Sequence, residues 1–462
     1  MNDTAVIICN YNKKAYVKKC VESLQNQTKK DFDIFVVDNA STDGSAEEIR
    51  STFGDAVTLI CNNENLGGSG GFNTGMKEAM NKGYRYLVLL DNDVVLKNDC
   101  IEQFYDGMED DPDIGMLGAR IMIMDMPDTI QEYGSMVDYD NLNFRLLHAW
   151  EKDDYTFPEI VECDYVPACA MIIRRKVIER IGFMPEENFV YYDDISWGSR
   201  CKRSGFKVAA KANAVVWHKG GISVNPTTFG NYYMVRNKTV FFMTNRDKAP
   251  VANGGEGTKE LAKKILREVF EGIYACHYNN LQKIGRTNFD AFLDAVTGVR
   301  GKALPQRIRQ KENSRDRLKE LLVGVNKILI YTYGLEIQTR QIVKDIQHIA
   351  NTENWKYVIE LISDKAMQEK NIMGYEIHDK PWEDPSEYDL ILHICDHIFN
   401  LKVDHVDRIW IDGRANILTN DEQLTMCNNF ESNFEVFESC FIERVIEKIG
   451  ELTEQEASRY GV

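Results

Sequence analysis

The sequence lacks the features that would place the protein outside the cell or within a membrane. Its eleven cysteines form no Cys-x-x-Cys pair, and Cys9, Cys61 and Cys169 stand inside apolar runs, where a free thiol behaves as a small hydrophobe. No apolar run approaches the length that spans a bilayer, and the first residues do not form a signal peptide. We therefore expect a cytoplasmic protein of a reducing compartment, with at most peripheral association at the inner face of the cell membrane.

A surplus of positive charge is also absent. The formal net charge is -17, and the long-range field of such a protein repels nucleic acids and anionic membranes. A nucleotide can still bind where a metal ion supplies the positive charge locally. The composition therefore argues against a nucleic-acid-binding protein and leaves a nucleotide-binding enzyme open.

The first half of the chain alternates short apolar runs with helical patterns. Apolar runs at 5–9, 32–38 and 57–61 predict strands, and residues between them have helical spacing. Strands that alternate with helices on short connections indicate a doubly wound, largely parallel α/β sheet. Ligands of such sheets bind at the carboxyl ends of the strands.

One apolar run, 87–90, ends abruptly in Asp91 and Asp93. Because an unpaired buried carboxylate is too costly, both acids must emerge at the C-terminal end of the strand. Two carboxylates one residue apart form a hard-oxygen pocket that suits Mg²⁺ or Mn²⁺ carrying a diphosphate. The alternative is an acidic turn that caps a helix starting near Lys97.

Two further features are expected at this edge of the sheet. Asp38 ends the second strand, where its carboxylate could accept hydrogen bonds from a base or ribose or could form an Asx turn. The glycine-rich stretch 65–75 precedes a helix, and its backbone N–H groups could approach an anion closely. This stretch matches neither the P-loop nor the dinucleotide fingerprint, so a plain flexible turn is the alternative.

A second acidic pair, Asp193 and Asp194, follows aromatic residues and precedes a helical pattern. Apolar surroundings raise the pKa of a carboxyl group, which suits a general base near neutral pH, whereas an N-cap of the helix is the alternative. The strand predicted over 208–216 leads into His218. A histidine there is more often a satisfied polar residue, but this one would join the acidic pairs if the strand ends converge. A further buried strand is expected over 163–174.

The second half of the chain has a different character. Residues 248–257 have the composition of a linker and precede two helices, 258–273 and 289–299. The basic stretch 305–319 could contact lipid headgroups, although its interleaved acids favour a solvated helix face.

Four short β runs between 327 and 411 predict a small, separate α/β module for docking or self-association. His393, Cys395 and His397 would share one side of a strand, but no spacing provides a fourth ligand for a soft metal. We therefore expect a catalytic domain over 1–245, a helical region over 246–324 that packs on it, and an accessory module over 325–462.

Six motifs, taken together, resemble those of the inverting family 2 glycosyltransferases, which have the GT-A fold. They cover roughly the first half of the chain, in the order of the family. The motifs are Ile-Ile-Cys-Asn-Tyr-Asn (7–12), Val-Asp-Asn-Ala-Ser-Thr-Asp-Gly (37–44), Asn-Leu-Gly-Gly-Ser-Gly-Gly (65–71), Leu-Asp-Asn-Asp (90–93), Tyr-Asp-Asp (192–194) and Trp-His (217–218). Together with Tyr-Tyr-Met-Val-Arg-Asn (232–237), they are most similar to galactofuranosyltransferases that polymerise mycobacterial galactan. Bacterial rhamnosyltransferases share a similar skeleton.

The resemblance implies roles for individual residues. Asp91, Asp93 and His218 would ligate Mn²⁺ or Mg²⁺ at the donor diphosphate, and Asp38 would contact the nucleoside. Asp194, beside Asp193, would deprotonate the acceptor hydroxyl, so that the anomeric centre inverts. The further positions expected to bind the donor are Asn10, Asn65, Gly67, Gly68, Gly71, Asn73 and Asn92, together with Asp91 itself.

The expected reaction is transfer of galactofuranose from UDP-galactofuranose to a cell-wall glycan or to its polyprenyl-linked precursor. A rhamnosyltransferase that uses dTDP-rhamnose and a non-catalytic glycan-binding protein are the alternatives, while nucleotidyl transfer is disfavoured because the glycine-rich stretch has no basic residues to hold a triphosphate. Ala168 and Cys169 stand where the mycobacterial enzymes carry tryptophans, and Met234 replaces a histidine. Acceptor recognition is therefore expected to differ.

Overall fold

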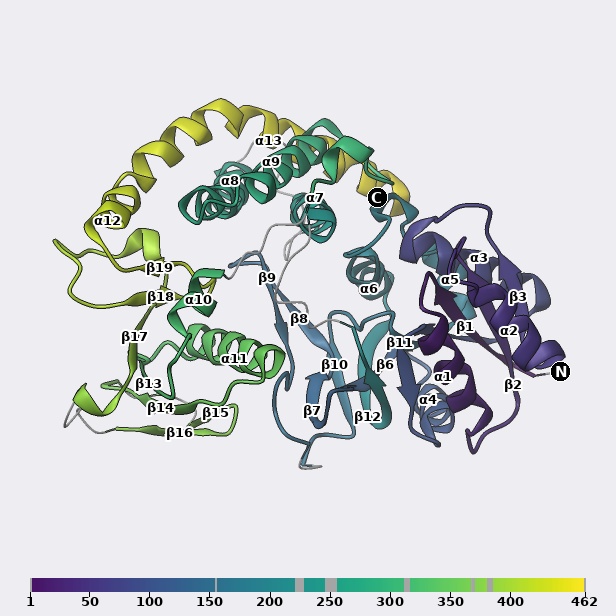
Figure 1. The fold of residues 1–462 in the computed structure, drawn as a ribbon. Helices are drawn as coiled ribbons and strands as arrows, with labels where there is room; N and C mark the ends of the chain where they lie inside the picture. Colours follow the sequence, from purple (N-terminus) through teal and green to yellow (C-terminus); the bar gives the residue numbers. More distant parts are fainter. Residues whose placement is uncertain are drawn as a thin grey trace.

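A computed structural model describes residues 2–153, 156–220, 228–245, 256–310, 316–365, 367, 370–379 and 385–460 of the 462-residue chain. Figure 1 shows a large N-terminal sheet and a smaller C-terminal sheet on opposite sides of the β8–β9 hairpin (Ser135–Asp138 and Asn143–Leu146), with α8, α9 and α13 running across one end of the molecule. No helix within the described ranges is both long enough and apolar enough to cross a membrane.

The N-terminal sheet has ten strands, of which eight follow the order β10-β12-β6-β11-β4-β1-β2-β3, while β5 pairs with β12 and β7 with β6. The strands are β1 (Thr4–Asn10), β2 (Phe32–Asp38), β3 (Thr58–Cys61), β4 (Tyr86–Asp91), β5 (Val94–Leu96), β6 (Ile114–Ile123), β7 (Met126–Glu132), β10 (Ile160–Cys163), β11 (Ala170–Arg174) and β12 (Lys207–His218). Strands β4, β1, β2 and β3 are parallel, whereas β11 is antiparallel to both of its neighbours. The predicted mixed, doubly wound sheet is confirmed.

Helices cover both faces of this sheet because its central strands are apolar on both faces. In β1, Val6 and Ile8 belong to one hydrophobic cluster, and Ala5 and Ile7 belong to the other. The first cluster contains residues of α1 and α4, and the second contains residues of α3, α5 and α6. These helices are α1 (Lys14–Gln25), α2 (Ser45–Phe53), α3 (Gly67–Lys82), α4 (Cys100–Asp110), α5 (Arg175–Ile181) and α6 (Asp193–Arg203).

The structure corrects three local expectations. The single strand expected over 163–174 is two strands, β10 and β11, with a turn between them that contains Pro167, which has no N–H for strand pairing. The helix expected near Lys97 begins at Cys100, because β5 intervenes. Most of the glycine-rich stretch is the first part of α3 and not a loop.

Close packing explains why this helix begins with so many glycines. A Cβ atom added at Gly75 would lie 2.5 Å from Ile7 Cγ2, and one added at Gly71 would lie 2.3 Å from Cys9 Sγ. The absence of side chains at these positions therefore lets α3 lie directly against β1.

In the described residues between the two sheets, the helices are α7 (Thr228–Thr244), α8 (Glu256–Tyr278), α9 (Gln282–Thr297) and the short α10 (Asp316–Leu321). The predicted linker at 248–257 lies mostly outside the described residues. The first part of the basic stretch, residues 305–310, is held by ion pairs to α9, because Arg307 and Arg309 each pair with Asp290. Residues 316–319 begin α10, where Asp316 is exposed and Arg317 and Lys319 are partly exposed, as expected of a solvated helix face.

The C-terminal sheet has seven strands in the order β15-β16-β14-β13-β17-β18-β19. They are β13 (Lys327–Tyr331), β14 (Val358–Ile362), β15 (Asn371–Ile372), β16 (Tyr375–His378), β17 (Leu390–Cys395), β18 (Trp410–Asp412) and β19 (Ile417–Leu418), with helices α11 (Glu336–Glu353), α12 (Asp421–Asn428) and α13 (Phe430–Tyr460). This part has its own hydrophobic cluster, yet α13 returns to pack on α8. The predicted helical region followed by a C-terminal sheet is confirmed, and the boundary at 324–325 stays a prediction.

Candidate active site

Strand pairing brings His218 to the acidic turn after β4. The end of β12 pairs antiparallel with β5, and His218 lies opposite Val94, the residue after Asp93. As a result, His218 Nε2 lies 3.3 Å from Asp93 Oδ1 and 3.7 Å from Asp91 Oδ2. Asp93 and His218 are buried, whereas the Asp91 side chain is 40% exposed.

These three side chains have the chemistry of a divalent-metal site. Their ligand atoms all lie within 4.8 Å of one another, and no other group of three such residues was found in the parts of the chain that the structure describes. Two carboxylates and an imidazole fit Mn²⁺ or Mg²⁺. The Lys13 ammonium lies 3.1 Å from Asp93 Oδ2, so this carboxylate already interacts with a cation.

Electrostatics act differently on the three side chains. Burial is the main cause that raises the pKa of Asp91 to about 6. Burial by itself would raise the pKa of Asp93, but its hydrogen bond with His218 and the charges of His218 and Lys13 lower that pKa to about 2. Burial would likewise lower the pKa of His218, but the hydrogen bond to Asp93 and the charge of Asp91 raise it. The site therefore keeps Asp93 ionised over the physiological range.

The second acidic pair opens α6. The N-cap of this helix is Tyr192, so the N-cap interpretation of Asp193 and Asp194 is wrong. Asp194 Oδ2 accepts a hydrogen bond from the Ala168 N–H (3.2 Å), and Asp194 Oδ1 accepts one from the Ile195 N–H (2.8 Å). These two bonds fix the orientation of the Asp194 carboxylate.

Burial and mutual repulsion raise the proton affinity of this pair. Burial first, and then the negative charge of Asp194, raise the pKa of Asp193 to about 7, and burial raises the pKa of Asp194. The charge of Asp91 also contributes to the raised pKa of Asp193, which means that the two acidic segments lie near each other. A carboxyl pair that exchanges a proton near neutral pH can serve as a general base.

A chain of hydrogen bonds links the acidic turn to Asp38. The Asn92 amide donates to Asn10 Oδ1 (2.9 Å), and the Asn10 amide donates to Asp38 Oδ1 (3.0 Å). Asp38 Oδ2 accepts the Ser41 N–H (2.9 Å), so the residue also stabilises its own turn. Asp38 therefore forms a turn with its own backbone and can also contact a nucleoside, because each carboxylate oxygen keeps a lone pair for a ligand.

The glycine-rich residues divide into two groups. A Cβ atom added at Gly68 would lie 3.7 Å from Asp193 Oδ2, which places the beginning of α3 beside the acidic pair, and Asn65 Oδ1 accepts the Gly67 N–H (2.8 Å). Gly71 packs against β1, as described above. The Asn73 amide donates to the Met184 carbonyl (2.8 Å) and thereby holds the segment before α6, so its polar atoms are used within the fold.

Two residues at the site, Lys13 and Glu132, were not predicted from the sequence. Lys13 follows the first strand, and a single lysine carries no recognisable spacing. Glu132 ends β7 and is buried, and burial raises its pKa to about 7, with further effects from Asp194 and His218. Its location depends on the pairing of β7 with β6, which the mixed pattern of this region did not predict.

The predicted soft-metal cluster does not form. The His393 ring hydrogen-bonds with the Tyr333 hydroxyl (2.8 Å) and stacks on Tyr331, whereas His397 lies 3.3 Å from Glu271. The two histidines therefore have different partners, in agreement with the missing fourth ligand.

Comparison with known proteins identifies the first part of the chain. Residues 5–182 match the family described as Glycosyl transferase family 2. An uncharacterised glycosyltransferase of Methanocaldococcus jannaschii is 24% identical over 211 residues, which cover 44% of this chain and 66% of the relative. The galactofuranosyltransferase GlfT2 of Mycolicibacterium smegmatis is 24% identical over 198 residues, which cover 39% of this chain and 30% of the relative.

Among solved structures, the mannosyltransferase PcManGT from Pyrobaculum calidifontis, in complex with GDP-Man and Mn²⁺, matches 64% of this chain and 74% of its own, with a TM-score of 0.38 and 14% identity. The chain thus spans less than a third of the length of GlfT2 and about two thirds of the length of the Methanocaldococcus jannaschii relative.

Proposed function

We propose that the whole chain is a metal-dependent, inverting glycosyltransferase, and the match of residues 5–182 to Glycosyl transferase family 2 supports this proposal. Its donor is a nucleoside diphosphate sugar, and its acceptor is a glycan hydroxyl. The observation that supports this proposal most strongly is the arrangement of Asp91, Asp93 and His218 as one ligand group near a buried carboxyl pair with raised pKa.

The proposed mechanism assigns separate tasks to the two acidic segments. Asp91, Asp93 and His218 would hold Mn²⁺ or Mg²⁺, and the ion when bound would neutralise charge on the leaving diphosphate. Asp194 accepts the proton of the acceptor hydroxyl, while its two backbone hydrogen bonds keep the carboxylate aimed. Attack from the side of this base, opposite the leaving group, inverts the anomeric centre.

For the donor we propose UDP-galactofuranose. The support is the partial similarity to GlfT2 and the motif at 232–237, which lies in α7. The cell-wall or polyprenyl-linked acceptor belongs to the same proposal, and dTDP-rhamnose is the competing donor.

The test is an assay of full-length protein with Mn²⁺ and a panel of nucleotide sugars, in which release of the nucleoside diphosphate is measured. We expect turnover with UDP-galactofuranose and a decrease of about 100-fold or more in kcat for Asp194→Asn, which is the typical contribution of a general base. Asp106→Asn, which changes an exposed carboxylate of α4, is the matched control.

The outcomes separate the parts of the proposal. Turnover with dTDP-rhamnose alone would show that this sugar nucleotide, and not UDP-galactofuranose, is the donor. An unchanged kcat in Asp194→Asn would show that Asp194 is not the base. Absence of turnover with every donor in both proteins would favour a binding function.

A further inference from the structure

A cavity lies between three parts of the chain and contains none of the residues of the candidate active site. It has a volume of about 650 Å³ and is lined by the β8–β9 turn, by α8, and by α11 with the loops after β17 and β18. Cavities of this size hold ligands larger than a single small ion.

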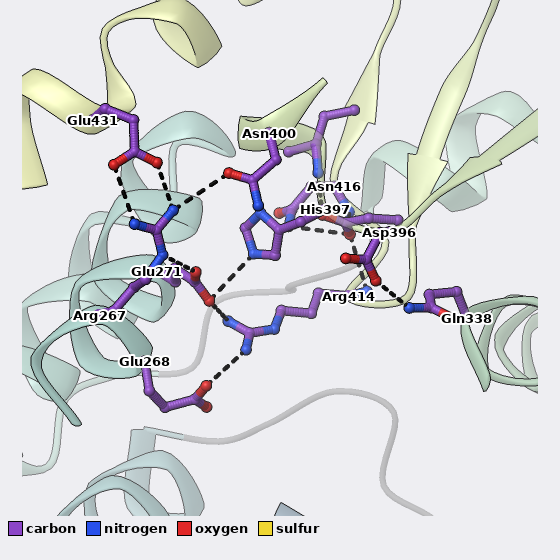
Figure 2. A network of polar contacts seen from close by, with 12 residues as sticks. Arg267, Glu268, Glu271, Gln338, Asp396, His397, Asn400, Arg414, Asn416 and Glu431 are labelled. Carbon is purple, nitrogen blue, oxygen red and sulfur yellow. Dashed lines mark hydrogen bonds and ion pairs between the residues drawn. The ribbon is translucent and has the colours of Figure 1, made fainter. Parts of the chain in front are cut away.

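A network of ion pairs forms one wall of this cavity (Figure 2). Arg414 pairs with Glu268 (2.9 Å) and Glu271 (3.3 Å), and Glu271 also lies 3.3 Å from His397 Nε2. Arg267, also from α8, pairs with Glu431 at the start of α13 (2.5 Å). The network ties the helical region to the C-terminal sheet, so the polar groups of the wall are held in place before any ligand arrives.

The charge of the lining argues against anionic ligands. Five carboxylates and three basic side chains face the cavity, so its net charge is negative and repels phosphate groups, nucleic acids and acidic lipid headgroups. Only Leu142 and Ile337 provide large apolar side chains, which is too little for a lipid tail.

The neutral groups of the lining suit a ligand with many hydroxyl groups. Four amide side chains line the cavity: Asn141, Asn143, Gln338 and Gln341. Three of them donate one N–H to a neighbouring carboxylate, which orients the amide and leaves its second N–H and its carbonyl oxygen for a sugar hydroxyl. Ile337, which is 81% exposed, offers an aliphatic surface for the C–H face of a ring. Together with the carboxylates and guanidinium groups of the wall, these side chains offer donors and acceptors to the hydroxyl groups of a sugar.

The β8–β9 hairpin connects this cavity to the proposed base. Val137 pairs with Phe144 close to the turn of the hairpin. The Val137 N–H donates to Asp164 Oδ2 (2.7 Å), and the Phe144 ring lies 5.5 Å from the ring of Tyr192, which directly precedes Asp193. The next pair toward the turn, Asp138 and Asn143, lines the cavity together with residues 140–142.

We propose that this cavity is a secondary binding site for the acceptor, which holds a distal segment of an uncharged oligosaccharide while its end is presented to Asp194. The inference rests on the proposed function, and it adds an acceptor longer than one sugar residue and a role for the C-terminal sheet.

The test is direct titration of full-length protein, without donor, with galactofuranosyl and rhamnosyl hexasaccharides, the corresponding disaccharides, and hexalysine. We expect one of the two hexasaccharides to bind more tightly than its disaccharide. The double variant Asn141→Ala/Gln341→Ala should weaken this binding about 10-fold, because two hydrogen-bonding side chains are lost. Gln347→Ala, in α11 but outside the cavity, is the matched control and should leave binding unchanged.

Binding is measured separately from turnover, so the two proposals can fail independently. In Asp194→Asn the hexasaccharide should still bind more tightly than its disaccharide, by the same ratio as in the unaltered protein, even where the variant transfers no sugar. Failure of both hexasaccharides to bind, equal affinity of the double variant and the unaltered protein, or binding of hexalysine alone would overturn the acceptor site.

Discussion

At the scale of single residues, the most informative feature is the raised pKa of Asp193 and Asp194. Burial is the main cause for both carboxyl groups, and the charge of Asp194 also raises the pKa of Asp193. The proposed base, Asp194, must be deprotonated, so activity should be lost on acidification at a higher pH than the pKa of an ordinary aspartate would give.

Replacing one member of the pair should move this pH dependence. In Asp193→Asn the mutual repulsion is gone, which should lower the pKa of Asp194 and shift the acidic limb of the kcat profile to lower pH, with activity retained above pH 8. The measurement is kcat between pH 5 and 9, with Asp106→Asn beside it. An unchanged midpoint would mean that another group controls the profile.

The residue scale also shows why spacing predicts some site residues and misses others. Asp91, Asp93 and His218 could be predicted because each stands where an apolar strand ends, and parallel and antiparallel strands then bring those ends together. Glu132 and Lys13 have no such marker, because their positions depend on which strands pair and on how a helix packs.

At the scale of elements, the beginning of α3 depends on glycine. A Cβ atom at Gly75 would meet Ile7 Cγ2 at 2.5 Å and Val37 Cγ2 at 3.0 Å, so α3 would have to move away from β1. The sequence predicted an anion-binding stretch here, with a flexible turn as the alternative, because dense glycine is a loop signal. The structure shows that the contact between α3 and β1 also requires glycine.

We therefore predict that Gly75→Ala lowers the free energy of unfolding by about 1–3 kcal/mol, as overpacking does in a buried contact. Gly272→Ala in α8 is the matched control, because the nearest atom to its added methyl group is 3.9 Å away. There the better helix propensity of alanine should stabilise the protein slightly. Urea unfolding measures both variants, and equal effects would contradict the proposed contact between α3 and β1.

At the scale of the whole molecule, the aromatic contacts of α13 join the C-terminal sheet to the helical region. The fully buried Phe430 stacks on Phe399 from the segment after β17, with 4.9 Å between ring centroids, and lies 5.2 Å from Phe270 of α8. The sequence predicted the strands of the C-terminal module from their apolar runs. The sequence could not predict that α13 packs on α8, because an amphipathic pattern does not specify the partner of its apolar face.

Loss of the aromatic contacts of Phe430 should weaken the packing between the C-terminal sheet and the helical region. Phe430→Ala should lower the free energy of unfolding by about 3–5 kcal/mol, as removal of a buried aromatic ring does, and should expose the segments around α13 to proteases. Val436→Ala in the same helix, at a position 64% exposed, should change stability by no more than about 0.5 kcal/mol. Urea unfolding and limited proteolysis test both variants. If Phe430→Ala were as stable and as protease-resistant as Val436→Ala, the C-terminal sheet would be held by its polar network alone.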